Sequence, residues 1–386
     1  MKLKYDAFKN ILIKFFIFIK IKKNWRRPKK AKIIIYDHLF YFYFEKYLKD
    51  KEYVIYHNRI QSDSEINVFI ILECLINFDF KFKTYRKRFF SYVNPKIVIT
   101  MFDNNPTFYK LKSEFPQLTT IAVQKAWKYD VEFDIIYDRH KKKDLGYQCD
   151  YLFCYNKFIA EIYSKFIKTK KIFLIGSFLS NFEEPSNEKK DYIIYISQWR
   201  NYNKSEKFHK NLNIGDWQKN EKIFLEKLIS FVEKNSFNLK VLGKTKLHTK
   251  KEKIYYDEIF GKNYEFIYQS EKRENYKILD AAKLTVSLDS TLAYENLARG
   301  NKTVFFSIRN DEKLDFDMIR FCWPERKNET GPNWTNSLSN AEFSRLFSVI
   351  DLNEIKWRET CKKYFEDTLI FDLNNSQFSK LLEEIN

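Results

Sequence analysis

The feature that most constrains the fold is an alternation of short runs of β-branched and aromatic residues with longer amphipathic stretches, which starts at Lys32. This pattern is typical of βα units around a mostly parallel sheet. Six strands are expected in the first half of the chain, at residues 32–36, 53–56, 96–100, 119–123, 151–155 and 171–175. Five more are expected in the second half, at residues 192–197, 239–242, 265–268, 283–288 and 302–306. The sequence therefore predicts an α/β protein with two sheets.

A stretch rich in Ser, Asn and Glu, residues 176–190, separates the two halves and has the composition of a linker. We predict two tandem Rossmann-like (doubly wound) domains, at residues 31–180 and 191–345, with a linker at 181–190. A basic N-terminal arm at residues 1–30 and a C-terminal helical segment at 346–386 complete the division. Because open α/β sheets bind ligands beyond the carboxyl ends of their strands, the site is expected in a cleft between the domains.

The net charge of +18, from 69 Lys and Arg against 51 Asp and Glu, raises the question of an anionic partner. Residues 1–30 carry eleven Lys or Arg and one acid, a net of +10, so that only +8 is left for the rest of the chain. A nucleic-acid-binding protein would be expected to carry such charge along a groove, and no RRM, KH or zinc pattern is present. We therefore expect no nucleic acid partner, while a catalytically silent scaffold with the same fold stays an alternative.

The arm contains an apolar run, residues 11–19, that is interrupted only by Lys14. It is too short to span a membrane, which takes about 20 helical residues. At helical spacing the run forms an apolar stripe, and the basic cluster that follows it would lie among anionic headgroups. No small-residue cleavage site follows the run. We expect residues 1–30 to bind an anionic membrane surface from the cytoplasmic side, the alternative being a core-packed helix followed by a solvated linker.

Metal binding is not indicated by the sequence. The five cysteines are odd in number and scattered, and the five histidines show no HExxH spacing. The string Asp315-Phe316-Asp317 has the DxD spacing but does not follow an expected strand. We expect reduced thiols, no metal and no cofactor.

The segment most informative about chemistry is residues 284–300, which reads strand, polar turn, helix and glycine stop. Ser290 and Thr291 can cap the helix, and the N–H groups at such a terminus favour a phosphate or pyrophosphate. Glu295 lies one turn further along the same face, where its carboxylate can accept hydrogen bonds from ribose hydroxyls. The alternative is an ordinary capped helix with a surface glutamate.

Three further residues are candidates for donor binding. Gly243 ends an expected strand and would let the backbone approach a ligand closely, with Lys244 beside it as a counter-charge for phosphate. Arg309 follows the last expected strand and is a candidate contact for an anion. The alternatives are equally simple: Gly243 would be a turn residue, Lys244 a solvated side chain and Arg309 part of a surface ion pair.

Two carboxylates are candidates for the base that would deprotonate an acceptor hydroxyl. Asp37 follows the first strand and stands next to His38, and Asp103 lies just beyond the strand that ends at Thr100. Asp103 is slightly favoured. Either residue could instead be a turn former or a helix cap, which is the commoner role of Asp before Asn and Pro.

The string Asp289-Ser290-Thr291, with Tyr294-Glu295 and Leu297-Ala298-Arg299-Gly300, resembles the donor-nucleotide segment of a family of surface-carbohydrate (O-antigen) biosynthesis transferases. More distantly it is similar to the second domain of GT-B glycosyltransferases. Further matches follow in the same order over roughly residues 32–340, among them Asp103-Asn104-Asn105, Gly176-Ser177, Tyr195-Ile196-Ser197-Gln198, Leu242-Gly243-Lys244 and Phe321-Cys322-Trp323-Pro324. One departure is Gln124-Lys125-Ala126, where the family pattern would have Gln-Asn-Gly.

The resemblance implies a GT-B architecture, in which the second domain binds a nucleotide-sugar as substrate and the first domain binds the acceptor. The expected function is a metal-independent glycosyltransferase that acts on a lipid-linked or surface glycan in surface polysaccharide biosynthesis. An alternative within the same architecture is a transferase of a CMP-activated ulosonic acid or a CDP-activated polyol phosphate.

Overall fold

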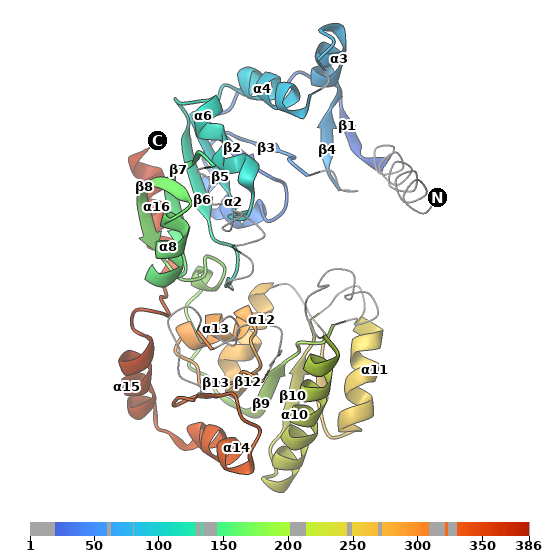
Figure 1. Ribbon diagram of the computed structural model, residues 1–386, viewed down its shortest axis with the longest axis vertical. Helices are drawn as coiled ribbons and strands as arrows, with labels where there is room; N and C mark the ends of the chain where they lie inside the picture. Colours follow the sequence, from blue (N-terminus) through green and yellow to red (C-terminus); the bar gives the residue numbers. More distant parts are fainter. Residues whose placement is uncertain are drawn as a thin grey trace.

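The computed structural model describes residues 20–59, 63–79, 81–128, 133, 145–200, 214–244, 249–268, 272–308, 321–322 and 330–385. They form two α/β domains, one above the other in Figure 1, each built around a six-stranded sheet. All strand pairs within these two sheets are parallel. The expected two tandem Rossmann-like domains are thereby confirmed.

The sheet of the first domain has the order β3-β2-β5-β6-β7-β8. Its strands are β2 (Ile33–Tyr36), β3 (Tyr53–Tyr56), β5 (Ile97–Thr100), β6 (Thr119–Val123), β7 (Tyr147–Cys154) and β8 (Ile167–Leu174). In β2, Ile33 and Ile35 face one hydrophobic cluster while Ile34 and Tyr36 face another. Both faces of the sheet are therefore buried, which explains why its strands read as continuous apolar runs.

Helices cover both faces of this sheet. On one face lies α2 (Phe42–Leu48), whose Tyr43, Phe44 and Leu48 are buried there. On the other face lie, among the described helices, α4 (Phe82–Val93), α5 (Pro106–Tyr109), α6 (Leu111–Glu114) and α8 (Lys157–Ser164). From β2 the chain continues to β3 on one side, and from β5 it continues through β6 and β7 to β8 on the other side. The switch point of the sheet, where this direction reverses, therefore lies between β2 and β5.

The sheet of the second domain has the order β11-β10-β9-β12-β13-β14, with its switch point between β9 and β12. Its strands are β9 (Lys190–Ile196), β10 (Leu239–Leu242), β11 (Glu265–Ile267), β12 (Ala282–Ser287), β13 (Thr303–Phe306) and β14 (Trp334–Thr335). The helices are α10 (Ile214–Lys234), α11 (Thr249–Phe260), α12 (Lys272–Ala281), α13 (Thr291–Ala298) and α14 (Asn340–Phe347). All eleven expected strands are present, and only the two-residue β14 was not predicted in this sheet.

The end of the chain returns to the first domain. After η4 (Ser348–Asp351) and α15 (Glu354–Phe365), the backbone passes through η5 (Leu373–Asn375) into α16 (Ser376–Glu384). Helix α16 lies at the end of β8, where the side-chain amide of Gln377 donates to the Leu174 carbonyl at 3.0 Å (Figure 1). Its Phe378 contacts the rings of Phe44, Phe153 and Phe178 at 5.1 to 5.7 Å. The predicted C-terminal helical segment thus divides between the two domains.

The chain that returns to the first domain after α15 passes close to the segment that leaves this domain after β8. Gly176 forms an isolated antiparallel bridge with Phe371. A Cβ atom at Gly176 would stand 1.7 Å from the carbonyl oxygen of Ile370, and its φ of +69° favours glycine. The stretch with the composition of a linker therefore begins with buried residues, Ser177, Ser180, Asn181 and Phe182, which lie at the domain junction. The predicted linker also ends one residue inside β9.

The predicted N-terminal arm, residues 1–30, is wrong in its second part. Residues 1–19, which include the predicted interfacial helix, lie outside the described residues, but β1 (Lys22–Asn24) pairs with β4 (Glu65–Asn67) in a two-stranded sheet. Lys22 forms an ion pair with Glu65 at 2.9 Å, and Arg27 lies over the ring of Phe69. These two cations have partners inside the fold, and the first described strand begins ten residues before the first predicted strand.

Candidate active site

Polar side chains gather where β2 and β5 end, at the switch point of the first sheet. Asp37 directly follows β2 and is 1% exposed. Its carboxylate lies 3.2 Å from Nδ1 of His38 and 3.1 Å from Nε of Arg59, and it accepts a hydrogen bond from the Leu39 amide. Burial, the largest effect, raises the pKa of Asp37. Asp37 is thus a buried carboxylate that contacts an imidazole.

The backbone at Asp37 has a φ of +109°, a conformation that non-glycine residues rarely adopt. The Asp37 amide donates to the Tyr56 carbonyl at 2.8 Å, and its own carboxylate holds the next turn through Leu39. Such strain persists only where the surroundings enforce it, and it occurs most often at functional sites. It distinguishes Asp37 from a routine turn former.

Two histidines complete this cluster. Nε2 of His38 lies 3.3 Å from the exposed carboxylate of Asp63, and the ring of His38 stacks on that of His57 at 4.7 Å. His57 accepts a hydrogen bond at Nδ1 from the Glu65 amide. Burial, with a smaller effect of His38, lowers the pKa of His57 to about 4. At neutral pH His57 is therefore an uncharged ring that supports His38.

This pKa shift predicts a dependence of stability on pH. The unfolded chain binds a proton at His57 near pH 6.5 and the folded chain only near pH 4, so the free energy of unfolding should fall as the pH drops through this window. His57→Asn keeps an oxygen that can accept from the Glu65 amide but does not titrate. We expect the variant to lose about 1 to 3 kcal/mol less than the wild type between pH 7 and pH 4. Urea titrations at both pH values measure the difference, and parallel losses would contradict the assignment.

Asp103, the slightly favoured base in the sequence analysis, lies beyond the end of the neighbouring strand β5 and is also 1% exposed. Its Oδ2 lies 3.2 Å from Nζ of the buried Lys128 and accepts a hydrogen bond from the Tyr163 hydroxyl. Its Oδ1 accepts from the Lys125 amide at 3.1 Å. The carboxylate of Asp103 thus ties three segments of the first domain together, and its role as the base stays a prediction.

In the second domain, three neighbouring strands end in polar turns around the other switch point. Gly243 and Lys244 follow β10, Ser197 and Gln198 follow β9, and Ser290 and Thr291 follow β12. In the orientation that satisfies both of its polar atoms, the amide of Gln198 donates to Asp289 at 3.2 Å and accepts from the Ser290 amide at 3.3 Å. Four predicted donor residues therefore meet at one edge of the sheet, and Arg309 lies outside the described residues.

The start of α13 has the geometry of an anion-binding terminus. Ser290 is the N-cap residue in an extended conformation, and its hydroxyl makes no capping hydrogen bond to the helix. Its amide is held by Ser287 Oγ at 3.0 Å. The first backbone N–H groups of a helix have no partner within the helix, so this terminus can receive a phosphate. The backbone N–H of Thr291, the first residue of the helix, is the first of these groups that could donate to a phosphate.

The structure explains why a glycine stands at position 243, which the sequence alone did not. A Cβ atom there would stand 2.7 Å from the ring of Phe266 and 3.3 Å from the carbonyl oxygen of Ile267 on β11. The neighbouring Lys244 amide donates to Glu252 at 2.7 Å, and the same carboxylate oxygen accepts from Ser197 Oγ at 2.5 Å. The buried Glu252 thus fixes the turns after β9 and β10 together, while the Lys244 side chain is exposed.

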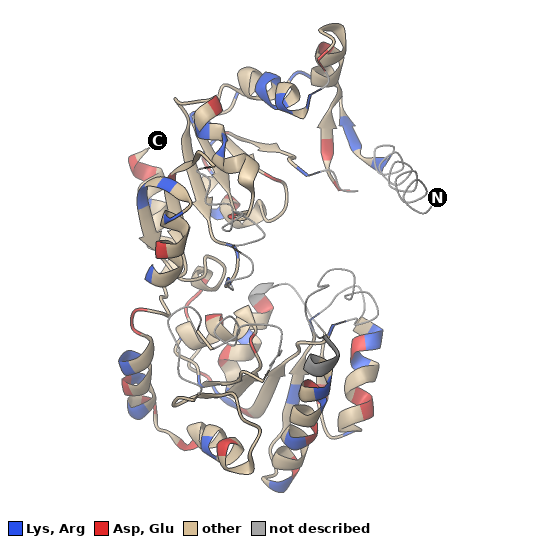
Figure 2. Ribbon diagram, viewed as in Figure 1, with Lys and Arg blue, Asp and Glu red and all other residues tan. Residues whose placement is uncertain are grey.

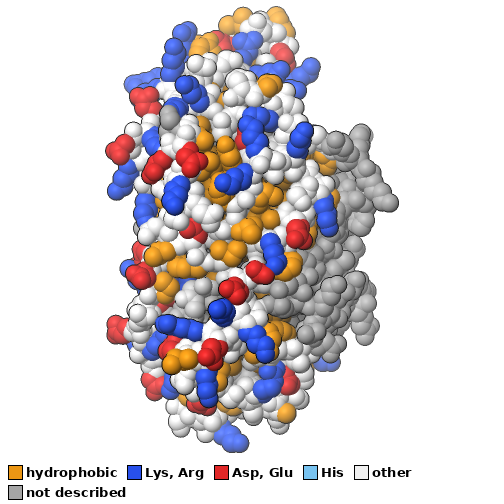
Figure 3. All heavy atoms as spheres, turned by 90° about the vertical axis from the view of Figure 1, so that its left-hand side faces the viewer, with side chains coloured by type: hydrophobic (Ala, Val, Ile, Leu, Met, Phe, Trp, Pro, Cys, Tyr) orange, Lys and Arg blue, Asp and Glu red, His pale blue; other side chains and the backbone are white. Residues whose placement is uncertain are grey.

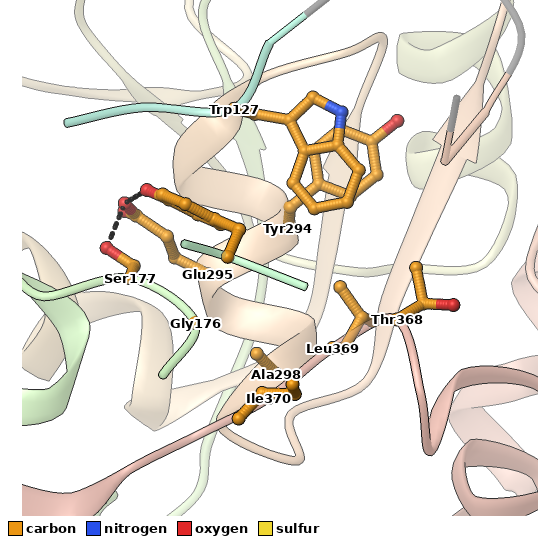
Figure 4. Close-up of a pocket in the computed structure, with 10 residues that line it drawn as sticks. Trp127, Gly176, Ser177, Tyr294, Glu295, Ala298, Thr368, Leu369 and Ile370 are labelled. Carbon is orange, nitrogen blue, oxygen red and sulfur yellow. Dashed lines mark hydrogen bonds between the residues drawn. The ribbon is translucent and has the colours of Figure 1, made fainter. Parts of the chain in front are cut away.

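Glu295 lies on α13, one turn after Thr291, and is buried at the junction of the two domains. Its carboxylate accepts hydrogen bonds from the hydroxyls of Tyr155 at 2.8 Å, Ser177 at 2.6 Å and Tyr276 at 2.7 Å. Figure 4 shows Glu295 pointing toward Ser177, with the ring of Trp127 stacked on that of Tyr294 at 4.3 Å. The cavity beside it measures about 10 Å³, which is too small for a ribose. A ribose contact by Glu295 stays a prediction that would require these hydrogen bonds to rearrange.

The sequence analysis missed His57, Arg59 and Gln198 as parts of these clusters. His57 and Arg59 follow β3 and Gln198 follows β9, so their places after expected strands were a signal that could have found them. In the described part of the chain, no three His, Cys, Asp or Glu side chains form a group that could hold a metal ion. Among the described helices, none has the length and apolar character that a membrane span requires.

Comparison with known proteins identifies the family. Residues 121–386, more than half of the chain, match the model of a family described as "putative O-antigen biosynthesis protein". The chain belongs to this family. The match includes the whole second domain and begins at β6 of the first, so Asp37 and Asp103 lie outside it. No protein of curated function matches the chain.

Solved structures support the fold assignment. The chain is similar to a structure titled "putative UDP-N-acetylglucosamine 2-epimerase" from Listeria monocytogenes, with 11% identity, a TM-score of 0.56, and coverage of 92% of this chain and 96% of that chain. It is also similar to the H548A variant of the wall teichoic acid polymerase TagF, with 12% identity, a TM-score of 0.51, and coverage of 92% and 89%. At such identities the likeness shows the GT-B-type fold and not the activity.

Proposed function

We propose that this protein is a glycosyltransferase that moves a sugar from a nucleotide-activated donor to a lipid-linked or surface glycan acceptor in surface polysaccharide biosynthesis. The observation that carries the proposal is the strained, buried Asp37 in contact with His38 at the switch point of the first sheet. A second polar edge, at the start of α13, stands at the corresponding switch point of the second sheet. Membership of the O-antigen biosynthesis family supports a surface glycan as the product.

The chemistry follows from these groups, written for a displacement with inversion. His38 accepts the proton of the acceptor hydroxyl at Nε2, in the place where Asp63 now lies, while the carboxylate of Asp37, 3.2 Å from Nδ1, stabilises the positive charge that forms on the ring. The acceptor oxygen forms a bond to the anomeric carbon as the bond from that carbon to the donor phosphate oxygen breaks. The N–H groups at the start of α13 stabilise the negative charge that develops on the departing phosphate. No step in this scheme calls on a metal ion, in keeping with the predicted metal independence.

An alternative donor within the same architecture is a CMP-activated ulosonic acid or a CDP-activated polyol phosphate. A thermal-shift screen of the full chain against UDP, GDP, CMP and CDP compounds distinguishes these donors. For its place in the cell we propose the cytoplasmic face of the membrane, through the basic residues at the start of the chain.

The proposed phosphate site can be tested by removing one donor without disturbing the helix. Thr291 is the first residue of α13, a position that proline favours, and Ser290 before it has φ −68° and ψ 133°, which a following proline accepts. Thr291→Pro should therefore keep the fold and weaken binding of the best nucleotide by about 1.5 to 3 kcal/mol, the range for hydrogen bonds to charged groups. Isothermal titration calorimetry measures the loss.

Glu354→Pro is the matched control, because Glu354 is exposed and is the first residue of α15 after the extended Asn353. It should leave both the melting temperature and the nucleotide affinity unchanged. Equal affinities for the two proline variants would remove the start of α13 from the donor site. Absence of any nucleotide binding by the wild type would overturn the proposed function itself.

A further inference from the structure

The tip of the first domain exposes a patch of large apolar side chains. It is formed by α3 (Val68–Ile76), the turn after it and the start of α4. Five side chains of this apolar tip, defined as residues 72–79 and 81–82, are between 42% and 86% exposed: Leu72, Leu75, Ile76, Phe78 and Phe82. Concentrated exposure of this kind marks a surface that binds a partner or a membrane.

The apolar tip is an ordered part of the fold. One side of α3 is buried through Ile70 and Cys74, which leaves the opposite side to solvent. The turn is closed by hydrogen bonds from the Phe78 amide to the Leu75 carbonyl at 3.0 Å and from the Asp79 amide to the Cys74 carbonyl at 3.0 Å. Phe78 itself has a φ of +49°, a costly conformation for an aromatic residue, so a large ring is held outward against local preference.

Positive charge surrounds the apolar tip. Residues 68–93 carry five Lys or Arg and two acids, and the adjoining residues 22–30 carry six and none. Three of these cations pair with acids outside the two ranges, Lys83 and Arg86 with Glu114 and Lys22 with Glu65, which leaves the larger part of the positive charge. Both acids have internal partners: Glu73 pairs with Arg88 at 3.6 Å, and Asp79 accepts a hydrogen bond from Thr84 at 2.7 Å. Figure 2 shows Lys and Arg on α4 and β1, on both sides of α3. The surface around the exposed apolar side chains is therefore cationic.

The position of the tip favours a bilayer over a protein partner. It projects at the end of the first domain that lies farthest from the second domain (Figure 1), and hydrophobic side chains with neighbouring basic ones cap the same end in Figure 3. A projecting tip can insert its side chains into the boundary between headgroups and acyl chains, where apolar burial and attraction to anionic lipids act together.

We propose that the apolar tip docks on an anionic lipid bilayer, with its five large side chains in the interface and Lys81 and Lys87 among the headgroups. This surface is separate from residues 1–19 and does not depend on the proposed transferase activity. Docking at the tip would direct the second domain away from the membrane.

The first test compares two double variants of the full chain in sedimentation with vesicles of phosphatidylcholine and about one third phosphatidylglycerol. Ile76→Gln with Phe78→Asn removes the apolar side chains, and Asn suits the positive φ at position 78. The control is Ile254→Gln with Ile355→Gln, at exposed helical positions of the second domain. We expect the partition coefficient to fall at least about tenfold for the tip variant only. Equal binding of the tip variant and the wild type overturns the proposal.

A charge variant tests the lipid class. Lys81→Gln with Lys87→Gln should lower binding to the anionic vesicles about tenfold and leave binding to pure phosphatidylcholine vesicles unchanged. An equal loss on both vesicles contradicts an anionic partner. If the Ile76/Phe78 variant instead turns a dimer into a monomer in sedimentation equilibrium without losing vesicle binding, the tip contacts a second copy of the chain, and the proposal is wrong.

A local probe separates the tip from the N-terminal residues. An environment-sensitive fluorophore on Phe78→Cys should shift its emission to the blue when anionic vesicles are added, while the same label on Ile355→Cys should not. The native cysteines contribute the same background to both proteins, since four are buried and Cys361 is half-buried. Equal emission changes at the two positions would show that vesicles bind through another part of the chain.

Discussion

Replacing Asp37 by Asn is expected to lower the turnover of sugar transfer by about 10²- to 10⁴-fold, the usual contribution of acid–base catalysis, while the affinity for the donor stays the same. The amide cannot stabilise the imidazolium that forms when His38 takes the acceptor proton at Nε2. Because burial raises the pKa of Asp37, its ionised form is costly in the fold, and the Asn variant should melt at nearly the wild-type temperature. Steady-state kinetics, calorimetry and thermal denaturation measure the three quantities.

The pH profile provides a second readout for Asp37. The wild-type rate should fall as the pH decreases through the raised pKa of this carboxyl, because only the ionised form stabilises the positive charge on the His38 ring. Asp103→Asn is the competing variant. If it abolishes turnover at unchanged melting temperature and Asp37→Asn does not, Asp103 is the base. If neither affects turnover, the base lies outside the cluster at the first switch point.

Replacing Arg299 by Leu is expected to reduce the free energy of unfolding by about 3 to 5 kcal/mol, because it leaves a buried carboxylate without its partner. Arg299 and Asp280 are each 2% exposed at their side chains, and two guanidinium nitrogens contact the carboxylate at 2.9 and 2.6 Å. The third nitrogen donates to the carbonyls of Ser180 and Glu183, in the segment between the domains. Urea denaturation measures the loss.

The control for Arg299 is Lys283→Leu, which breaks an exposed ion pair with Asp191 at 3.2 Å and should change stability by at most about 0.5 kcal/mol. In a double-mutant cycle, Arg299→Leu with Asp280→Asn should cost clearly less than the sum of the two single variants. Additive losses would mean that the pair is not coupled. A loss below about 1 kcal/mol for Arg299→Leu would contradict its structural role.

The two sheets could be predicted from the sequence because local signals define their strands. In a run such as Ile33 to Tyr36, the side chains on both faces of the strand are apolar. This pattern is typical of a strand that is covered on both sides. The edge strand β14 could not be predicted, since two residues carry no periodicity. The pairing of β1 with β4 could not be predicted, because the lysines of β1 are not typical of a strand and the partner of Lys22, Glu65, is distant in the chain.

The positions of Asp37 and Ser290 after the ends of strands could be predicted from the sequence, while their roles stay predictions. The partners of Glu295 could not be predicted, because Tyr155 and Ser177 stand 140 and 118 residues away and reach it only across the domain junction. The same holds for Asp103, whose contact with Tyr163 spans 60 residues. Sequence patterns indicate which residues stand at a strand end, whereas the burial and bonding of a carboxylate depend on the assembled fold.

The path of the chain at the domain junction limits how the two domains can move. The polypeptide passes between them twice, once from Gly176 to β9 and once from α15 to α16, and the two passages touch where Gly176 bridges Phe371. Motion that pulled one passage would also pull the other, so sliding or separation of the domains is opposed. Rotation about this point would also break the hydrogen bond from Tyr155 to Glu295 and the stacking of Trp127 on Tyr294, which join the same two domains. A change in the angle between the domains would therefore have to begin with the release of these two contacts.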